Sequence, residues 1–490
     1  MARGAAANVG GALAATVLSF ALSLLITHQI RAGEFGLYSI ALVTVLLGQV
    51  PATLGLDVGA VRFVALRATR GDAAGARASL QAALWVVALT STVLAFLLFW
   101  QAHWVTESFF HKPAATELVR IVAFSLPALC LTRVVIGGLQ GIGVMGYSAL
   151  VTPIRVAANV AVALPVLLAG YGARGLSAAF LGVSWLTLLV AAGFLVYALP
   201  GALSPAGANG QLRPLLRFSL PQTLTTLLLQ TILWTDTVLV GRLRTAAEVG
   251  IYTIVQRLLS PAQTVSTATG QMFAPRIAAE DARGERETLA VMLKRVTYWN
   301  VSLAIPVFGL LLLVPGPLLR LFGPAYDSGA TALAILAAGQ LVNAATGPLG
   351  QVINMSGRPY LTLVNNAAVA GLNIVGCVIL IPRHGITGAA CSTTAAITLV
   401  NLIKLVQVRA LFGINPFREE TLRALGAGAL AAVVTLPLVL FVSWPGPLLE
   451  VVAAAAVMLP LYAVFFWRSA AGAEERELLR LRAGPVVAAK

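Results

Sequence analysis

The sequence predicts an all-α polytopic membrane protein. About fourteen apolar stretches follow one another along the 490 residues, each near the roughly 20 apolar residues that a spanning helix needs. Nearly all of the charge lies between these stretches. Hydrophobic residues make up 59% of the chain, charged residues only 10%, and the mean hydropathy is +0.89. A soluble chain of this length could not bury so much apolar surface, so the solvent of this chain is a bilayer.

The predicted spans can be placed in order from the N-terminus. Val9–Ile30 is too long for the apolar region of a signal peptide and continues into another apolar stretch, so it is interpreted as the first span. Ala, Leu, Val and Gly predominate and alternating short strands are absent, which indicates helices and not a β-barrel. The predicted spans are 9–30, 36–56, 80–100, 118–139, 148–170, 175–199, 215–240, 248–272, 296–319, 329–353, 360–381, 386–408, 421–442 and 446–467.

The placement of basic residues predicts the topology. The net charge is +15, and loops after even-numbered spans carry more than twice as many Lys and Arg residues as loops after odd-numbered spans. Because cytoplasmic loops are enriched in Lys and Arg, both termini are expected in the cytoplasm. An even number of spans requires the same. Basic loops also suit anionic lipid headgroups, and no nucleic-acid partner is expected.

Two short phrases indicate an internal duplication. Glu34–Ile40 reads EFGLYSI after the first span, and Glu248–Ile254 reads EVGIYTI after the seventh, so Glu, Gly, Tyr and Ile recur at an offset of 214 residues. The loops after the fifth and eleventh spans share a Gly-x-x-Gly pattern beginning at Gly172 and Gly385, an offset of 213 residues. Each copy would hold six spans, which makes the copies parallel repeats.

The duplication predicts the domain organisation. Residues 1–205 form an N-lobe of six spans, and residues 206–412 form a C-lobe of six spans. Residues 413–490 contain spans thirteen and fourteen and a cytoplasmic tail. The Ala, Gly and Pro-rich segment Pro200–Pro214 is the expected linker. In transporters with such repeats, the substrate site lies between the halves near mid-membrane, and the halves rock to alternate access.

Polar side chains form stripes on several spans when each is projected at 100° per residue. A stripe along a whole helix indicates the wall of a water-filled cavity, whereas hydrogen bonding between helices is the alternative for any single amide or hydroxyl. The candidate substrate-binding residues of this central cavity are Arg155, Asn159, Gln230, Arg257, Gln263, Gln340, Asn343, Asn366 and Asn373.

Few charged residues lie well inside the spans, and Arg155, Asp236 and Arg257 are the main ones. A guanidinium group suits phosphate oxygens, so the two arginines indicate a cationic cavity for an anionic headgroup. The alternatives for an arginine are snorkelling to the interface or pairing with Asp236. Asp236 either neutralises an arginine or binds a coupling cation.

Other chemistry finds no support in the sequence. Cys130, Cys377 and Cys391 all lie inside predicted spans, and the four histidines lack metal-ligand spacing, so no disulfide or metal framework is expected. The sequence contains no Walker A, HExxH or GxSxG motif and no kinase signature. The longest outer loop, around Gln101–Glu117, is too short for a catalytic domain. No enzyme activity is therefore predicted.

The chain resembles the oligosaccharide flippases of the polysaccharide-transporter family, often called Wzx-type flippases. They share a superfamily with multidrug exporters and the lipid II flippase. The resemblance covers nearly the whole chain and rests on several phrases taken together with the fourteen spans and the duplication. The phrases are Glu34–Ile40, Asp236–Gly241 followed by Glu248–Tyr252, Phe322–Tyr326, and Asn373 with Leu380–Ala390.

The resemblance implies two lobes around a central cavity and a polyprenyl-pyrophosphate-linked oligosaccharide as substrate. That substrate would move from the cytoplasmic to the outer leaflet for surface polysaccharide biosynthesis, in the inner membrane of a bacterium. No cofactor is expected, and Na⁺ or H⁺ is the candidate coupling ion. Besides the lipid-linked oligosaccharide and membrane lipids, a polysaccharide polymerase and chain-length proteins are candidate partners.

Three alternatives remain open from the sequence. A cation-coupled drug or metabolite exporter of the same superfamily usually has twelve spans and an acid in the N-lobe cavity, whereas span one here holds no acid. A lipid II flippase would have the same architecture and a related cargo. A membrane enzyme that uses a lipid-linked donor would need a better equipped outer loop.

Overall fold

The computed structural model describes residues 16, 18–201, 212–283, 285–356 and 359–470. Within them every regular element is a helix and no strand occurs, which confirms the predicted fold class. Nine helices in this part of the chain are long and apolar enough to cross a membrane, or up to eleven if each of two bent pairs is one span. The chain is a multi-pass membrane protein. The count of fourteen spans stays a prediction, and the start of the first span and most of the linker lie outside the described residues.

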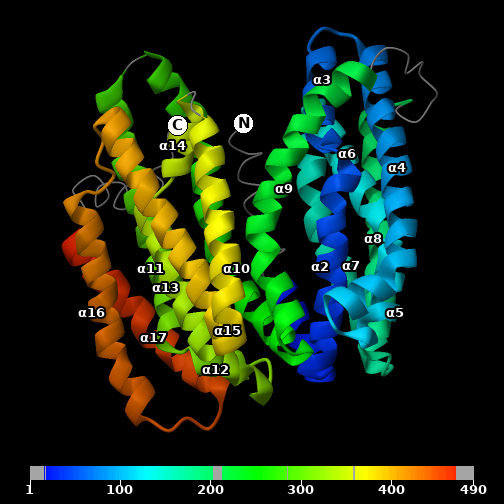
Figure 1. Cartoon of the computed structure of the whole chain (residues 1–490). Coiled ribbons are helices and arrows are strands. Elements are labelled where there is room, and N and C mark those ends of the chain that lie inside the picture. Colours follow the sequence, from blue (N-terminus) through cyan, green and yellow to red (C-terminus); the bar gives the residue numbers. More distant parts are fainter. Residues whose placement is uncertain (1–15, 17, 202–211, 284, 357–358, 471–490) are drawn as a thin grey trace, which may run out of the picture. The chain divides into compact units, whose positions relative to one another are not determined.

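One compact unit, unit 1, comprises the chain up to Leu258 together with Asn373–Ala389. Its first helix, Leu18–Gln29, precedes the labelled elements of Figure 1. The others are α2 (Ala32–Thr53), α3 (Leu56–Ala68), α4 (Ala73–His103), the short η1 (Trp104–Phe109) and η2 (Pro113–Ala115), α5 (Thr116–Ala123), α6 (Leu126–Gly141), α7 (Met145–Leu168), α8 (Gly172–Ala198), α9 (Leu212–Leu243) and the beginning of α10 (Ala246–Arg283).

The other compact unit, unit 2, comprises Leu259–Leu372 and the chain from Ala390 onward. The long α15 therefore belongs to unit 2 at its ends and to unit 1 in its middle. The domain limits predicted from the repeat are not the same divisions and stay predictions. Unit 2 holds the rest of α10, α11 (Arg286–Leu313), α12 (Pro315–Arg320), η3 (Pro324–Gly329), α13 (Ala330–Thr346), α14 (Leu349–Met355), most of α15 (Pro359–Phe412), α16 (Glu419–Phe441), α17 (Pro447–Phe465) and η4 (Phe466–Ala470).

The second predicted span is followed by a helix where a loop is expected. The predicted span over 36–56 corresponds to α2, which ends at Thr53, and the separate helix α3 then runs from Leu56 to Ala68. Leu54 and Gly55 between them have φ angles of 51° and 65°, in the left-handed region. A Cβ at position 55 would lie 2.5 Å from the carbonyl oxygen of Ser219 on α9, so glycine suits this close approach.

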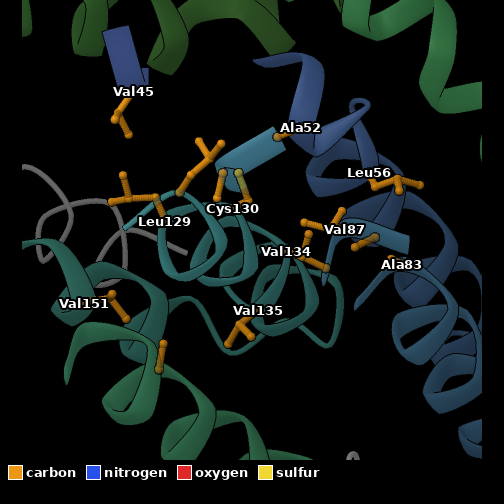
Figure 2. Packing of buried hydrophobic residues seen from close by; sticks show 14 of the residues in the cluster. Val45, Ala52, Leu56, Ala83, Val87, Leu129, Cys130, Val134, Val135 and Val151 are labelled. Carbon is orange, nitrogen blue, oxygen red and sulfur yellow. The ribbon is translucent and has the colours of Figure 1, made fainter. Parts of the chain in front are cut away.

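Small residues pack α6 against α3 in the core of unit 1. Gly137 and Gly141 are one helical turn apart, a spacing that lets two helix backbones approach closely. A Cβ on Gly137 would overlap the carbonyl oxygen of Asp57, and one on Gly141 would meet Val64 at 2.8 Å. Buried side chains of α2, α3, α4, α6 and α7 surround this contact. Figure 2 shows part of this cluster, which includes Val45, Leu56, Val87, Leu129, Cys130, Val134 and Val151.

Unit 2 has two smaller apolar cores. One joins α10, α11, α14 and α15 around Leu293 and Val352, and the other joins α11, α16 and α17 around Tyr298 and Met458. The tight break between predicted spans 360–381 and 386–408 falls at Gly385, whose φ of 58° interrupts α15.

Candidate functional site

Arg155 on α7 lies within the bilayer-spanning part of unit 1. Its side chain is partly buried and makes no ion pair with any residue that the structure describes. The guanidinium group of Arg133 on α6 is close enough to repel it. Arg133 in turn lies 3.8 Å from the carboxylate of Asp57 on α3. Two guanidinium groups against one carboxylate leave this arginine cluster with an excess of positive charge.

The sequence found Arg155 but missed its neighbours. Arg133 lies on α6, in the second arm of the bent helix pair Pro113–Ala123 and Leu126–Gly141. Asp57, just beyond the predicted span 36–56, lies in the first turn of α3. Only the packing of α3 against α6 brings the two residues together, and no local pattern signals it.

Arg257 on α10 is held against two other helices of unit 1. Its Nη1 atom donates a hydrogen bond of 2.5 Å to the Oγ atom of Ser23, which is buried. Its guanidinium group lies 5.4 Å from the centre of the Phe35 ring on α2, a cation–π distance. These contacts direct the Arg257 side chain towards protein.

Asp236 on α9 is 2% exposed and accepts hydrogen bonds from both α9 and α10. The Tyr252 hydroxyl and the Gln256 amide of α10 each donate to its Oδ2 atom at 2.7 Å, and the Thr237 backbone N–H donates to Oδ1 at 2.8 Å. The two bonds from Tyr252 and Gln256 tie α9 to α10. The predicted alternatives, an arginine partner and a coupling cation, stay open.

Several predicted amides are used within their own helix. Asn159 donates through Nδ2 to the carbonyl oxygen of Arg155 at 2.9 Å, and Gln230 accepts from the Trp234 indole at 3.1 Å. Asn373, which belongs to unit 1, is buried beside Cys377. Each keeps only part of its hydrogen-bonding capacity for a ligand.

Other amides form a connected group in unit 2. Asn401 on α15 donates to Asn343 at 3.0 Å, and Asn343 donates to Gln340 at 3.4 Å, both on α13. Asn343 remains exposed, while Gln340 is buried. Gln263 and Asn366 are partly buried. Asn401 was missed because it lies on the far arm of α15, 58 residues from its partner.

The two duplicated phrases contact each other. A Cβ on Gly36 of α2 would overlap the carbonyl oxygen of Ala246 on α10, and a Cβ on Gly250 would overlap that of Ala32. Residues 32 and 246, and residues 36 and 250, are separated by the same 214 residues as the two phrases. Such a reciprocal contact is what a local two-fold axis between duplicated units would produce. The glycines let the two backbones touch.

Side chains that could ligate a metal are not grouped in the residues described. In that part of the chain, no three His, Cys, Asp or Glu side chains are grouped so that they could hold a metal ion.

Outside the spans, the Gly75 N–H and the Arg67 guanidinium hold the pKa of Asp72, which caps α4, below its usual value.

These features define a helical membrane protein of the transporter type, with charged and amide side chains inside its spans. The chain belongs to the polysaccharide biosynthesis protein family, whose sequence profile matches residues 26–328. The resemblance drawn from the sequence to polysaccharide-transporter flippases is thereby confirmed at the level of the family.

Two curated relatives come from the archaeon Haloferax volcanii. The probable flippase AglR is 27% identical over 204 residues, which is 41% of this chain and 43% of AglR. The probable low-salt glycan biosynthesis flippase Agl15 is 24% identical over 161 residues, 33% of this chain and 34% of Agl15. The chain thus matches less than half the length of either relative.

Solved structures show the same fold. The lipid II flippase MurJ in an inward closed conformation superposes with a TM-score of 0.75 at 14% identity, over 96% of this chain and 99% of MurJ. An inward-facing transporter of the MATE family gives a TM-score of 0.64 at 17% identity, over 81% of this chain and 94% of the transporter. A MOP superfamily transporter from Pyrococcus furiosus gives a TM-score of 0.59 at 16% identity, over 84% of this chain and 95% of that transporter. At these identities the likeness concerns the fold alone.

Proposed function

We propose that this protein is a flippase, and not an enzyme, that moves a polyprenyl-pyrophosphate-linked oligosaccharide from the cytoplasmic to the outer leaflet. The product would feed surface polysaccharide biosynthesis, and the two lobes would alternate access to the substrate. Membership of the polysaccharide biosynthesis protein family and the glycan flippases among its relatives support this proposal.

The observation that carries the proposal is the positive arginine cluster inside the spans. Arg155 has no ion pair in the described chain, and Arg133 is only loosely balanced by Asp57 at 3.8 Å. A charge inside a membrane is costly, so a protein retains it where it serves a purpose. The planar guanidinium fork matches the oxygens of a phosphate, and a pyrophosphate would supply the missing negative charge.

The remaining parts of the substrate follow from their chemistry. Sugar hydroxyls lose their hydration water inside a membrane unless protein groups replace it. Amides both donate and accept hydrogen bonds, so the group formed by Gln340, Asn343 and Asn401 is suited to sugar hydroxyls. The polyprenyl chain is apolar and would stay in the lipid. Outward movement of each negative charge is favoured by about 2.3 kcal/mol per 100 mV of inside-negative potential.

The proposal leaves two roles open for Asp236 on α9. It is either a structural acceptor that ties α9 to α10 or the site of coupling to Na⁺ or H⁺. A polysaccharide polymerase and chain-length proteins would receive the product on the outer face.

Deletion in the native host, followed by extraction of polyprenyl-linked sugars, tests the function. We expect a complete repeat unit to accumulate on the cytoplasmic face while surface polysaccharide is lost. Normal surface polysaccharide with raised sensitivity to cationic dyes would instead indicate a drug exporter. Arrest of peptidoglycan synthesis with accumulated lipid II would indicate a lipid II flippase. Either result would overturn the proposal.

A further inference from the structure

A polar pocket lies at the end of unit 1 where α2, α5 and α8 begin. Its volume is about 750 Å³, and its lining includes Glu34, Glu117, Arg120, Tyr171 and Arg174. The three walls come from the loops after the first, third and fifth predicted spans. The distribution of basic residues predicts that these loops face the outside of the cell.

The charges of this outer pocket are balanced. Arg174 forms an ion pair with Glu117, and both side chains are well exposed. The guanidinium group of Arg120 lies 5.6 Å from the centre of the Phe99 ring, which holds it at the pocket wall. Two acids and two arginines favour neither a strong anion nor a strong cation. They favour a ligand that offers many hydrogen-bond donors and acceptors.

Glu34 is the acid that the protein leaves available. Its counterpart in the second phrase, Glu248, accepts hydrogen bonds from the Arg244 Nε atom at 2.8 Å and from the Thr245 N–H and hydroxyl at 3.1 and 3.0 Å. Glu34 is exposed and makes no hydrogen bond or ion pair within the described part of the chain. One of two equivalent carboxylates is thus satisfied internally, and the other is offered to the pocket.

Glycine geometry keeps that carboxylate accessible, and an aromatic residue lines the same pocket. A Cβ on Gly172 would lie 3.2 Å from the Oε2 atom of Glu34, so a side chain there would crowd the carboxylate. Gly170 and Gly172 have φ angles of 78° and 53° and enclose Tyr171 in a tight turn. The Tyr171 side chain is 67% exposed. An exposed ring of this kind offers a flat apolar face with a polar edge.

We propose that the outer pocket is a binding site for the saccharide part of the substrate after it has crossed the membrane, an inference that rests on the proposed function. The apolar face of a sugar ring packs on Tyr171, its hydroxyls donate to Glu34, and Arg120 donates to its oxygens. The pyrophosphate has no counterpart here, since the pocket lacks excess positive charge. The pocket retains the sugars that have arrived and so opposes their return.

Binding to the full-length protein in lipid nanodiscs tests this site apart from transport. The probe is the oligosaccharide released by mild acid from the polyprenyl-linked pool of the host, followed by saturation-transfer NMR and titration. We expect Glu34→Gln and Tyr171→Ala to weaken binding at least tenfold. Tyr171→Phe keeps the ring and should stay within about twofold of the wild type. Glu248→Gln, at the equivalent but occupied position, should also bind normally.

Two further results separate the outcomes. Arg155→Ala should lose transport yet keep oligosaccharide binding, because the arginine cluster and the outer pocket are different sites. Equal binding by wild type, Glu34→Gln and Tyr171→Ala, or no binding by the wild type, would overturn the pocket while leaving flipping untouched. Unchanged oligosaccharide binding by Glu34→Gln with loss of a co-purifying polymerase would assign the pocket to a protein partner instead.

Discussion

Arg133 and Arg155 carry the excess positive charge of the arginine cluster, and their removal is the sharpest change at the residue scale. We expect Arg155→Ala or Arg133→Ala to lower surface polysaccharide at least tenfold, because a pyrophosphate would lose one of its two guanidinium partners. Arg155→Lys should restore export partly, since the charge is kept while the planar fork is lost. Immunoblotting of surface polysaccharide and of membrane-inserted protein measures both effects.

Arg70→Ala is the matched control for this prediction. Arg70 is exposed in the turn before α4 and forms no ion pair with any residue that the structure describes, so its loss should leave export unchanged. Wild-type export by both Arg133→Ala and Arg155→Ala would show that the cluster does not bind the substrate. Loss of the protein from the membrane would show that its role is in folding.

A second prediction concerns the hydrogen bonds of Asp236 and the stability of the protein. Asp236→Ala leaves the buried Tyr252 hydroxyl without its acceptor, which costs about 1–3 kcal/mol, so the melting temperature of the purified protein should fall. Asp236→Asn keeps an acceptor for Tyr252 and should melt close to the wild type. If the Asn variant also exports normally, the carboxylate charge has no coupling role. If it folds but fails to export, Na⁺ or H⁺ coupling through Asp236 is supported.

Helical projection predicts residues of this kind only in part. It placed Asn159 and Gln230 on polar stripes. It does not show that Asn159 donates to the Arg155 carbonyl oxygen or that Gln230 accepts from the Trp234 indole, each one turn away. It found Asp236, whereas the hydrogen bond that Asp236 accepts from Gln256 depends on how α9 and α10 pack. The sequence gives the type of each side chain directly, but its hydrogen-bond partner depends on how the helices pack.

The contact between α2 and α10 makes a prediction at the element scale. A Cβ at Gly36 would overlap the Ala246 carbonyl oxygen, so Gly36→Ala must push the helices apart. Overpacking of this kind costs about 1–3 kcal/mol, and we expect a lower melting temperature and reduced export. Gly33→Ala is the matched control, because no atom lies within 4 Å of a Cβ at that position on the same helix. Equal melting of the two variants would contradict the close contact.

Helix bounds were predicted well where the bilayer sets the length of an apolar span, and poorly where contacts between helices set them. Lipid requires every backbone group to be satisfied within a helix, so apolar runs such as 175–199 and 421–442 correspond closely to α8 and α16. The break at Leu54–Gly55 escaped notice because the sequence stays apolar through it. α9 approaches Gly55 closely at this break, and hydropathy does not record such a contact.

At the scale of the whole molecule, the basic loops predict that both termini lie in the cytoplasm. Fusion of a reporter that fluoresces only in the cytoplasm to either end should therefore give a signal, while alkaline phosphatase fused there should be inactive. A fusion at Pro113, in an outer loop, should show the opposite pattern. The reverse result at any of these three positions would invert the proposed direction of transport and the outer placement of the saccharide pocket.

Reconstitution gives the most direct measurement of the central claim. Purified protein in sealed vesicles is supplied with the host's polyprenyl-pyrophosphate oligosaccharide, and the fraction reached by an added glycosidase is followed over time. We predict that wild-type vesicles expose lipid from the inner leaflet, whereas Arg155→Ala vesicles expose only the lipid that started outside. Equal exposure by wild type, Arg155→Ala and protein-free vesicles would contradict the claim that this protein is a flippase for lipid-linked oligosaccharides.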